Sequence, residues 1–518
     1  MFGLANRRDN NLRMLERARG SQNTPPGWNR VIVLANRAPL RHEYAADGAV
    51  VVKRSAGGLV TALEPLIETY SGTWVAHAAG DADSLVVDDR GGMSVPPANP
   101  QYRVRYVSLP EAEHRGYYYG FANEGLWPLC HAVDVMPTFR RIDFQMYQAA
   151  NARFATAVAG EAGGGSPLVL VQDYHFALAP RMLRQRLPSS TVVAFWHIPW
   201  PRAGTFRTCP WARELLDGLL GSNIVGFQTD DDCRNFLGCV EALLDAEVDL
   251  LQNTITYRGQ STAVRAYPVG IDCSNEAVRA LPSFAACRER VCRDLGLPPG
   301  VRLGVGIDRM DYTKGINEKF LAVERLLKLK PEFREHFVFV QVAEPSRDCL
   351  PSYRAARTQI LETSERVNRR FGTSSYRPIR LLESHHEPAD VYRYYRCADL
   401  CYVGSLHDGM NLVAKEFVSA RDDERGVLVL SQFAGAAQQL RAALVVNPSR
   451  VDQSAAALAE ALDMSVAEQS IRMRLLRANV AKFDASWWAQ QMVQDAMVDT
   501  HRRHSTSSQG FVPEAISA

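Results

Sequence analysis

The sequence lacks a long apolar run and has almost no net charge. None of its hydrophobic stretches approaches the roughly 18–20 residues that a membrane-spanning helix needs, so no membrane segment is predicted. Lys and Arg number 59 against 57 Asp and Glu, which gives a formal net charge of +2. So small an excess indicates neither nucleic acid nor an anionic membrane as a partner. Any bound anion must therefore be held by a local cluster.

Cysteine patterns and common hydrolytic motifs are also missing. The 10 cysteines are scattered, without a C-x-x-C pair or a metal-ligand spacing, so neither a metal site nor a cofactor is predicted. No signal peptide is recognisable, and we expect reduced thiols in a cytoplasmic protein. The absence of a Ser-His-Asp order, an H-E-x-x-H pair and a Walker lysine argues against a hydrolase or a P-loop enzyme.

Short apolar runs rich in β-branched residues recur along the chain, with helical segments between them. They are continuous rather than alternating, as strands covered on both faces should be. The first series comprises 31–36, 168–173, 192–198 and 223–229, and the second comprises 301–307, 337–343, 378–382, 399–404, 427–431 and 444–448. Helical segments such as 179–187 and 232–244 separate the strands, which predicts two doubly wound α/β domains.

The length of 518 residues is enough for two large domains, because single cores stop growing beyond about 250–300 residues. We expect the boundary near 272–285. The predicted parts are a flexible tail over 1–28, an N-terminal domain over 29–272, a C-terminal domain over 273–480, a returning helix over 481–503 and a disordered tail over 504–518. The site should lie in the cleft between the domains, at the carboxyl ends of their strands.

Charged residues crowd the turn G-I-D-R-M-D-Y-T-K-G (306–315), which lies between a predicted strand and a helix. In that helix Glu318, Lys319 and Arg325 lie between the apolar positions. Backbone amides and a helix N-terminus favour an anion at such a turn, and Arg309 and Lys314 could hold a diphosphate. In the alternative interpretation Arg309 pairs with Asp308 or Asp311.

A second cluster is H-D-G-M-N-L-V-A-K-E-F-V (407–418), a turn followed by a helix. Asp408 would contact a sugar near the turn. Glu416, eight residues further on, would contact a ribose, as carboxylates do in nucleotide sites. The alternative is a plain turn and helix with a Lys415–Glu416 pair on the surface.

Weaker signals lie in the N-terminal half. S-A-G-G-L-V (55–60) would let the backbone at Gly57 and Gly58 approach a diphosphate. In the aromatic run 117–128, Tyr118 and Trp127 are candidates for stacking on a sugar ring, although most of these rings are expected in the core. His197 follows a strand and precedes a proline, and a lone His there is as often structural as functional.

Together these segments resemble the trehalose-6-phosphate synthase family of retaining nucleotide-sugar glycosyltransferases. The matching stretches are A-N-R (35–37), S-A-G-G-L (55–59), N-E-G-L-W-P (123–128), Q-D-Y-H (172–175), H-I-P-W-P (197–201), G-F-Q-T (226–229), Y-P-V-G-I (267–271), D-R-M-D-Y-T-K-G (308–315), S-R (346–347), D-G-M-N-L-V-A-K-E (408–416) and S-Q-F-A-G-A-A (431–437). The resemblance implies two Rossmann-like domains facing across a cleft (GT-B type), with the donor, usually UDP-glucose, on the C-terminal domain.

The resemblance also implies roles for individual residues. The donor residues are Arg309 and Lys314 for the diphosphate, Glu416 for the ribose and Asp408 for the glucose, with the main-chain amides of Asn411 and Leu412 nearby. Asp173 and His197 would flank the reacting sugars. The acceptor residues are Arg37 and Arg347 for its phosphate and Tyr118, Trp127 and Tyr174 around its ring.

The implied reaction forms α,α-trehalose 6-phosphate from two small-molecule substrates, UDP-glucose and glucose 6-phosphate. It retains the anomeric configuration and needs neither a protein nucleophile nor a metal. A helix around 486–488 is expected to cross back to the N-terminal domain. A homo-oligomer is possible, and the sequence does not decide the oligomeric state.

Two departures from the family pattern keep other interpretations open. V-A-H-A-A-G-D-A-D follows Trp74 where a Gly-Trp-Ser-Gly-like run is usual, and P-L-C-H-A-V follows Trp127. Both lie in the acceptor half. Glycerol 3-phosphate is therefore the alternative acceptor, as in glucosylglycerol-phosphate synthases, and a catalytically silent sugar-phosphate-binding subunit is a further alternative.

Overall fold

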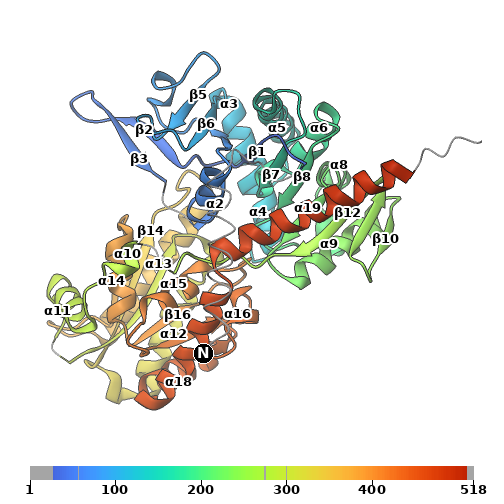
Figure 1. Cartoon of the computed structure of the whole chain (residues 1–518). Helices are drawn as coiled ribbons and strands as arrows, with labels where there is room; N and C mark the ends of the chain where they lie inside the picture. The colour runs from blue at the N-terminus through green and yellow to red at the C-terminus, as the bar shows by residue number, and fades with distance from the viewer. Residues whose placement is uncertain (1–26, 56–57, 274–275, 299, 510–518) are drawn as a thin grey trace, which may run out of the picture. The chain divides into compact units, whose positions relative to one another are not determined.

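The computed structural model of the chain describes residues 27–55, 58–273, 276–298 and 300–509. By its internal contacts the chain divides into two compact units. The first comprises the chain up to Cys130, Pro137–Tyr267 and the chain from Trp488 on, and the second comprises His131–Met136 and Pro268–Trp487. Each unit contains one mainly parallel sheet (Figure 1).

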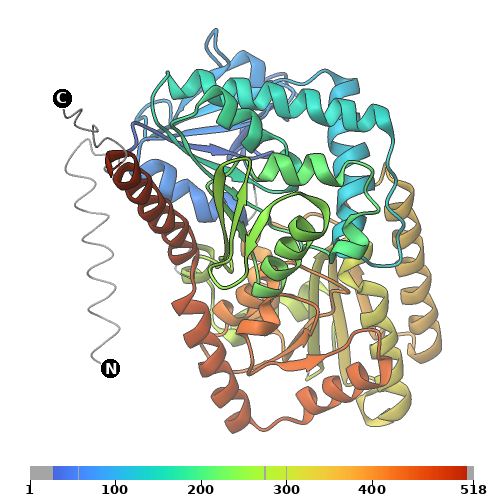
Figure 2. The same cartoon turned by 90° about the vertical axis from the view of Figure 1, so that its right-hand side faces the viewer.

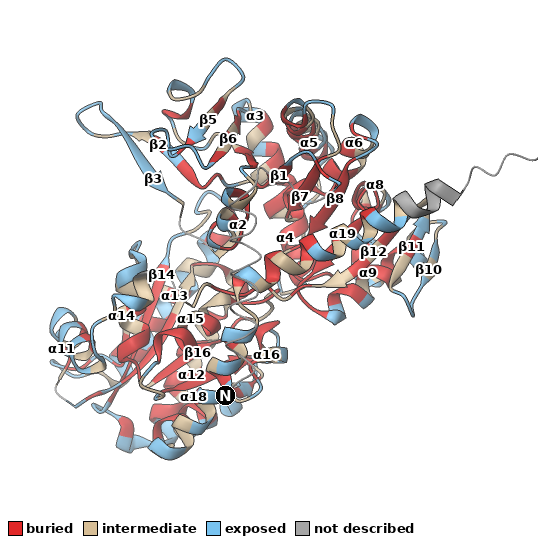
Figure 3. Ribbon diagram, in the orientation of Figure 1, coloured by how far each residue is buried: buried red, intermediate tan, exposed pale blue. Residues whose placement is uncertain are grey.

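The sheet of the first unit has ten strands within the described residues, in the order β10-β11-β12-β9-β8-β7-β1-β4-β6-β5. Their bounds are β1 Val31–Leu34, β4 Thr73–His77, β5 Gly92–Val95, β6 Tyr102–Val107, β7 Leu168–Gln172, β8 Thr191–Phe195, β9 Ile224–Phe227, β10 Glu247–Asp249, β11 Thr254–Tyr257 and β12 Gln260–Ala266. Neighbours from β12 to β6 are parallel, and the outermost strands are antiparallel. The four predicted strands of this half are β1, β7, β8 and β9, which are adjacent and buried (Figure 3).

The direction of winding in this sheet reverses between β1 and β7. From β1 the chain continues outward through β4 and β6, whereas β7, β8 and β9 follow on the other side. At such a switch point the connections leave in opposite directions, and a crevice opens beyond the carboxyl ends of the two strands. Asn36 and Arg37 follow β1 there, and Asp173 follows β7.

The sheet of the second unit is entirely parallel, with the order β15-β14-β13-β16-β17-β18. Its strands are β13 Arg302–Arg309, β14 Phe337–Glu344, β15 Ile379–Leu382, β16 Leu400–Val403, β17 Val427–Ser431 and β18 Leu444–Val446. They confirm all six strands predicted for this half, and the predicted doubly wound fold class is confirmed. The winding reverses between β13 and β16, so the turn after Arg309 and the loop after Val403 meet at one switch point.

The helices are α2 Gly58–Thr69, α3 Glu111–His114, α4 Trp127–His131, α5 Arg141–Ala162, α6 Ala179–Arg186, α7 Ala203–Phe206, α8 Ala212–Leu219, α9 Asp230–Leu243, α10 Glu276–Arg279, α11 Phe284–Asp294, α12 Ile316–Leu329, α13 Pro351–Phe371, α14 Pro388–Cys397, α15 Leu412–Ala420, α16 Ala436–Gln439, α17 Val451–Asp463, α18 Val466–Lys482 and α19 Ala485–Gln509. Tighter or wider turns form η1 Asp83–Leu85, η2 Arg115–Leu126, η3 Tyr174–Phe176, η4 Tyr312–Lys314 and η5 Pro331–Phe333, of which η2 is a π-helix. The predicted helices 179–187 and 232–244 are confirmed as α6 and α9. Among the described residues, no helix combines the length and apolar character needed to cross a membrane.

One hairpin was not predicted. Strands β2 (Leu40–Tyr44) and β3 (Val50–Arg54) pair only with each other. The valines of β3 are exposed, as the pale blue ribbon in Figure 3 shows. An apolar run in this position therefore does not mark a core strand.

The C-terminal helix α19 completes the first unit (Figures 1 and 2). The ring of Trp488 is fully buried and lies 5.1 Å from that of Phe195 on β8. Further along, the Tyr267 hydroxyl donates to Asp495 Oδ2 over 2.6 Å. The helix is thus attached along several strands of this sheet.

Candidate functional site

The cationic turn of the second unit connects β13 to α12 through η4. Asp311 caps η4, because its Oδ1 accepts hydrogen bonds from the Thr313 amide and hydroxyl, both at 3.0 Å. Gly315 then begins α12 with a φ of 60°. A Cβ there would lie 2.0 Å from the Gly404 carbonyl oxygen, so this position needs glycine. The turn after β13 and the loop after β16 are therefore in close contact.

Lys314 and Asp408 form an ion pair at this contact. The Lys314 Nζ lies 2.5 Å from Asp408 Oδ2, which also accepts from Ser405 Oγ at 3.2 Å and Asn411 Nδ2 at 3.1 Å. Burial alone would raise the pKa of Asp408, but Lys314, followed by His131 and the Asn411 amide, lowers it to about 2. The carboxylate is therefore ionised at neutral pH.

Asp311 is the counter-ion of the cationic cluster. Burial opposes its ionisation, yet the nearby charges of Arg309, Arg347 and Lys314 lower its pKa overall. Arg347 NH1 lies 3.8 Å from Asp311 Oδ2 and 2.5 Å from the Tyr353 hydroxyl. Three predicted site cations thus gather around one buried carboxylate, which is an arrangement suited to an anion with several negative charges.

Asp308 has a different partner from the one expected. It pairs with Lys319 and accepts from Gln341 Nε2 at 2.9 Å. The Lys319 side chain is fully buried, whereas a lysine between the apolar positions of an amphipathic helix is normally solvated. Its position one turn into α12 directs it to the end of β13, where Asp308 compensates its charge.

Helix α15 presents the second predicted cluster. Asn411, at φ 77°, caps it by accepting from the Ala414 amide at 3.3 Å. Glu416 accepts from the Tyr395 hydroxyl at 3.1 Å, and burial raises the pKa of this carboxyl. Lys415 is buried and donates to the Val269 carbonyl at 2.6 Å. The alternative of a Lys415–Glu416 surface pair is therefore wrong.

In the first unit Arg37 is exposed immediately after β1. Its carbonyl accepts from the Trp74 indole at 3.0 Å, and the neighbouring Asn36 carbonyl accepts from the His77 amide at 3.3 Å. These contacts continue the β1–β4 pairing beyond the strands. The backbone that carries Arg37 is thereby fixed while its guanidinium is open to solvent.

The predicted acceptor rings belong to one series of ring contacts. His77 lies 4.6 Å from His114, His114 lies 5.4 Å from Tyr118, and Tyr118 lies 5.6 Å from His175, each pair nearly parallel. The ring of Tyr174 lies 4.1 Å from that of His175. Sequence reasoning missed the three histidines, although His77 ends a strand and His114 lies four residues before Tyr118.

Asn123 links the predicted rings. Its amide donates to the Tyr118 carbonyl at 2.7 Å, and its carbonyl oxygen accepts from the Tyr174 hydroxyl at 3.0 Å. Trp127 lies 5.8 Å from Tyr174, and both rings are buried, whereas Tyr118 is partly exposed. Of Tyr118, Trp127 and Tyr174, Tyr118 is therefore the one whose side chain can contact a ligand without rearrangement.

Asp173 and His197 lie together at the ends of β7 and β8. Asp173 has a φ of 78°, and its Oδ1 accepts from the amides of Tyr174 at 2.9 Å and His197 at 3.2 Å. His197 Nε2 lies 2.9 Å from Gln172 Oε1, so Nε2 carries the ring proton. Burial lowers the pKa of His197 to about 3, and the ring is neutral at physiological pH.

Comparisons with known proteins identify the family of the chain. The model of glycosyltransferase family 20 matches residues 29–497. The chain belongs to glycosyltransferase family 20. It is 37% identical to the trehalose-6-phosphate synthase of Mycobacterium avium (strain 104) over 493 residues, 94% of this chain and 98% of the relative.

Two solved structures are similar to this family 20 chain in fold as well as in sequence. An α,α-trehalose-phosphate synthase (UDP-forming) from Burkholderia xenovorans, in complex with glucose-6-phosphate, matches with a TM-score of 0.79 and 31% identity over 90% of this chain and 100% of its own. An E. coli structure, described as trehalose-6-phosphate bound with UDP-2-fluoro glucose, matches with a TM-score of 0.80 and 30% identity over 90% and 99%. The predicted GT-B type fold is confirmed.

Within this family 20 chain the predicted site residues divide between the units. Arg37, Gly58, Tyr118, Trp127, Asp173, Tyr174 and His197 lie in the first unit, and Arg309, Lys314, Arg347, Asp408, Asn411, Leu412 and Glu416 lie in the second. Gly58 is the first residue of α2. Gly57 lies outside the described residues.

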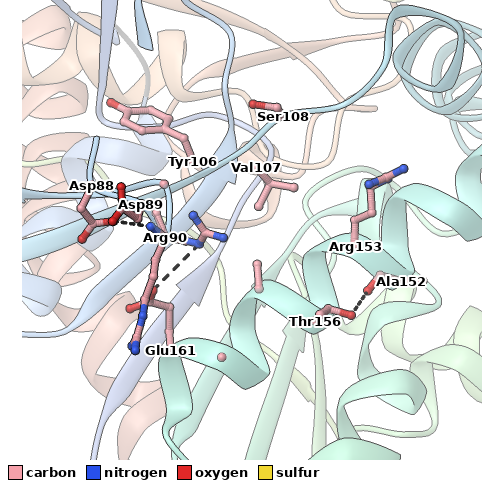
Figure 4. A pocket seen from close by; sticks show the side chains of 14 residues that line it. Asp88, Asp89, Arg90, Tyr106, Val107, Ser108, Ala152, Arg153, Thr156 and Glu161 are labelled. Atoms are coloured by element: carbon pink, nitrogen blue, oxygen red, sulfur yellow. Dashed lines mark hydrogen bonds and ion pairs between the residues drawn. The ribbon is translucent and has the colours of Figure 1, made fainter. Parts of the chain in front are cut away.

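A pocket of about 990 Å³ in the first unit is separate from all these residues (Figure 4). Several charged side chains in or beside it have partners. Arg103 contacts Asp88 at 2.6 Å and Glu161 at 3.3 Å, and Arg153 contacts Glu113 at 2.9 Å. None of the predicted site residues lines this pocket.

Proposed function

We propose that this family 20 enzyme transfers glucose from UDP-glucose to glucose 6-phosphate and forms α,α-trehalose 6-phosphate and UDP. The observation that carries the proposal is the 37% identity to a trehalose-6-phosphate synthase over nearly the whole chain. The solved relatives with a UDP-sugar and with glucose-6-phosphate support the same two substrates. Glycerol 3-phosphate is not favoured as the acceptor.

The donor would bind at the switch point of the second unit. Arg309 and Lys314 neutralise the diphosphate, and the amides at the N-terminus of α15 (Asn411 and Leu412) add partial positive charge. Asp408 binds glucose hydroxyls. Glu416 binds the ribose, and the backbone at Gly58 is a further donor to the diphosphate. The gathering of cations around Asp311 supports this assignment.

The acceptor would bind through its phosphate and its ring. Arg37 and Arg347 take the phosphate as charge-assisted hydrogen-bond donors. Tyr118 contacts the sugar, while Tyr174 and Trp127 support Tyr118 from the buried side. Asp173 and His197 flank the reacting sugars. His197, being neutral, acts as a hydrogen-bonding group and not as a general acid.

The transfer would occur on one face of the donor. The bond between the glucose C1 and the diphosphate oxygen breaks, the acceptor hydroxyl oxygen bonds to C1 on the same face, and its proton passes to the departing diphosphate. This route retains the configuration without a protein nucleophile. Arg309 and Lys314 stabilise the charge on the leaving group, so we propose that the reaction needs no metal.

The test is UDP release from UDP-glucose by the purified protein, with glucose 6-phosphate and glycerol 3-phosphate offered separately. We expect release with the hexose phosphate. UDP release only with glycerol 3-phosphate would show that this compound, and not glucose 6-phosphate, is the acceptor. Failure to bind UDP in calorimetry would favour a catalytically silent subunit. We also propose a cytoplasmic location. The ten cysteines, all described, are free thiols, which suits a reducing compartment.

A further inference from the structure

Two histidines outside the assigned site, His77 and His114, extend the ring series of the first unit. The His77 and His114 rings are 4.6 Å apart at 19°, and the His114 and Tyr118 rings are 5.4 Å apart at 8°. His77, His114 and Tyr118 are each partly exposed. Three nearly parallel rings thus present their edges at the carboxyl end of β4, beside the backbone that carries Arg37.

Each histidine is held by different secondary structure. The His77 amide donates to the Asn36 carbonyl at the end of β1, and its Nδ1 lies 3.2 Å from the Val107 carbonyl at the end of β6. His114 is the last residue of α3 and stacks on Tyr118 in the π-helix η2. The stack therefore joins the sheet to η2 and fixes the orientation of the Tyr118 ring.

The contact with Val107 decides which nitrogen of His77 carries the proton. A carbonyl oxygen only accepts, so Nδ1 donates and Nε2 is left with its lone pair. Burial lowers the pKa of both rings, that of His114 to about 4 with a further contribution from His77. At neutral pH His77 thus offers a hydrogen-bond acceptor beside the edges of the stacked rings.

We propose that His77 and His114 determine the selectivity for a hexose acceptor: His77 Nε2 accepts a hydrogen bond from a sugar hydroxyl, and His114 positions Tyr118 against the ring. This inference rests on the proposed function and names the part of the site that recognises the sugar rather than its phosphate. Tyr118 stacks on both His114 and His175, so the sugar contacts the edges of the rings. A pyranose carries several hydroxyls on one rigid ring, so one can bond to His77 Nε2 while its C–H groups contact the edge of Tyr118. A three-carbon phosphate has no such ring.

The experiment compares four variants with the wild type by KM for glucose 6-phosphate, KM for UDP-glucose and kcat. His77→Phe keeps a ring in the stack but removes the acceptor nitrogen, and His77→Gln restores an acceptor oxygen. His114→Leu removes the contact with Tyr118. His336→Phe, at an exposed position of the second unit, is the matched control.

We expect His77→Phe to raise the KM for glucose 6-phosphate about tenfold, as the loss of one hydrogen bond does, with the KM for UDP-glucose unchanged. His77→Gln should recover part of this loss, and His114→Leu should raise the same KM about threefold or more. His336→Phe should match the wild type. The inference would be overturned if His77→Phe and His114→Leu kept the wild-type KM for glucose 6-phosphate. It would also be overturned if their KM values for glucose 6-phosphate and for UDP-glucose rose together.

The wild-type arm separates this inference from the proposed function. A wild type that turns over glycerol 3-phosphate and not glucose 6-phosphate refutes both. If the wild type uses glucose 6-phosphate and the variants have the same KM for it, only the role of the histidines is refuted. UDP binding, measured by calorimetry, shows whether each variant is folded. If His114→Leu fails to bind UDP, the comparison of His77→Gln with His77→Phe tests the inference instead.

Discussion

Lys314 Nζ lies 2.5 Å from Asp408 Oδ2, and each side chain is only 13% exposed. The two groups come from turns that follow neighbouring strands, β13 and β16, so the sheet itself brings them together. We assign the lysine to the diphosphate and the carboxylate to the glucose of one donor. Their contact sets the distance between these two subsites before any substrate arrives.

Replacement of Lys314 should affect the chemical step most. The leaving diphosphate gains charge in the transition state, and the loss of one preorganised cation typically costs about 10²-fold in turnover. Lys314→Ala should therefore lower kcat by that factor. The measurement is UDP release at saturating substrates, with Lys328→Ala, on the exposed end of α12, as the control. Unchanged turnover in Lys314→Ala would remove the proposed leaving-group role.

The same ion pair predicts coupled effects on stability. Removal of one partner leaves the other charge buried without compensation, which costs about 3 kcal/mol or more, whereas removal of both charges is nearly neutral. Lys314→Met should lower the free energy of unfolding, and adding Asp408→Asn should restore most of it without restoring activity. Urea unfolding of both variants measures this. Additive losses in the double variant would contradict the pairing.

Arg37 should bind the acceptor's phosphate and contribute little to the fold, because its side chain is exposed. A charge-assisted hydrogen bond contributes about 1.5–3 kcal/mol, or roughly 10- to 150-fold in affinity. Arg37→Ala should raise the KM for glucose 6-phosphate within that range and leave the KM for UDP-glucose unaltered. Arg41→Ala, on the exposed hairpin, is the control. Equal effects of the two substitutions would argue against a phosphate contact.

Lys415 predicts a pH dependence of stability. Burial lowers its pKa to about 7 from the ordinary lysine value of 10.5. Between these values the unfolded chain binds a proton that the folded chain does not, so stability rises with pH. Relative to Lys415→Met, the wild type should gain up to about 1.4 kcal/mol per pH unit above pH 7. Urea unfolding from pH 6 to pH 9 tests this, and a constant difference would show that the lysine stays charged.

Chelation tests the proposed metal-independence. If Arg309 and Lys314 alone neutralise the leaving group, dialysis against EDTA should leave kcat unchanged within about twofold. Readdition of Mg²⁺ or Mn²⁺ should then have no further effect. A loss of activity that a divalent cation reverses would assign part of the leaving-group stabilisation to a metal.

The central strands and the polar residues at their carboxyl ends could be predicted from the sequence. Runs such as V-I-V-L (31–34) and V-L-V-L-S (427–431) are continuous in apolar residues because both faces of a parallel sheet are covered. Polar residues directly after such runs must lie at the carboxyl edge. Arg37, Asp173 and Arg309 were therefore found without knowledge of the fold.

Lys319, Lys415 and the histidine stack could not be predicted in the same way. A lysine on an amphipathic helix is normally solvated. Its burial depends on a carboxylate or carbonyl outside the helix, here Asp308 for Lys319 and Val269 for Lys415. The contact of His77 with His114 likewise joins residues on β4 and α3. Local patterns carry no information about such partners.

The return of α19 to the first unit has a consequence for how the protein is made. Phe195 on β8 leaves the ribosome long before Trp488, the residue that covers it. The main part of the second unit, Pro268–Trp487, is synthesised between these two events. The apolar surface around β8 must therefore stay uncovered during most of translation, so the nascent first unit is a substrate for chaperones until the last helix emerges.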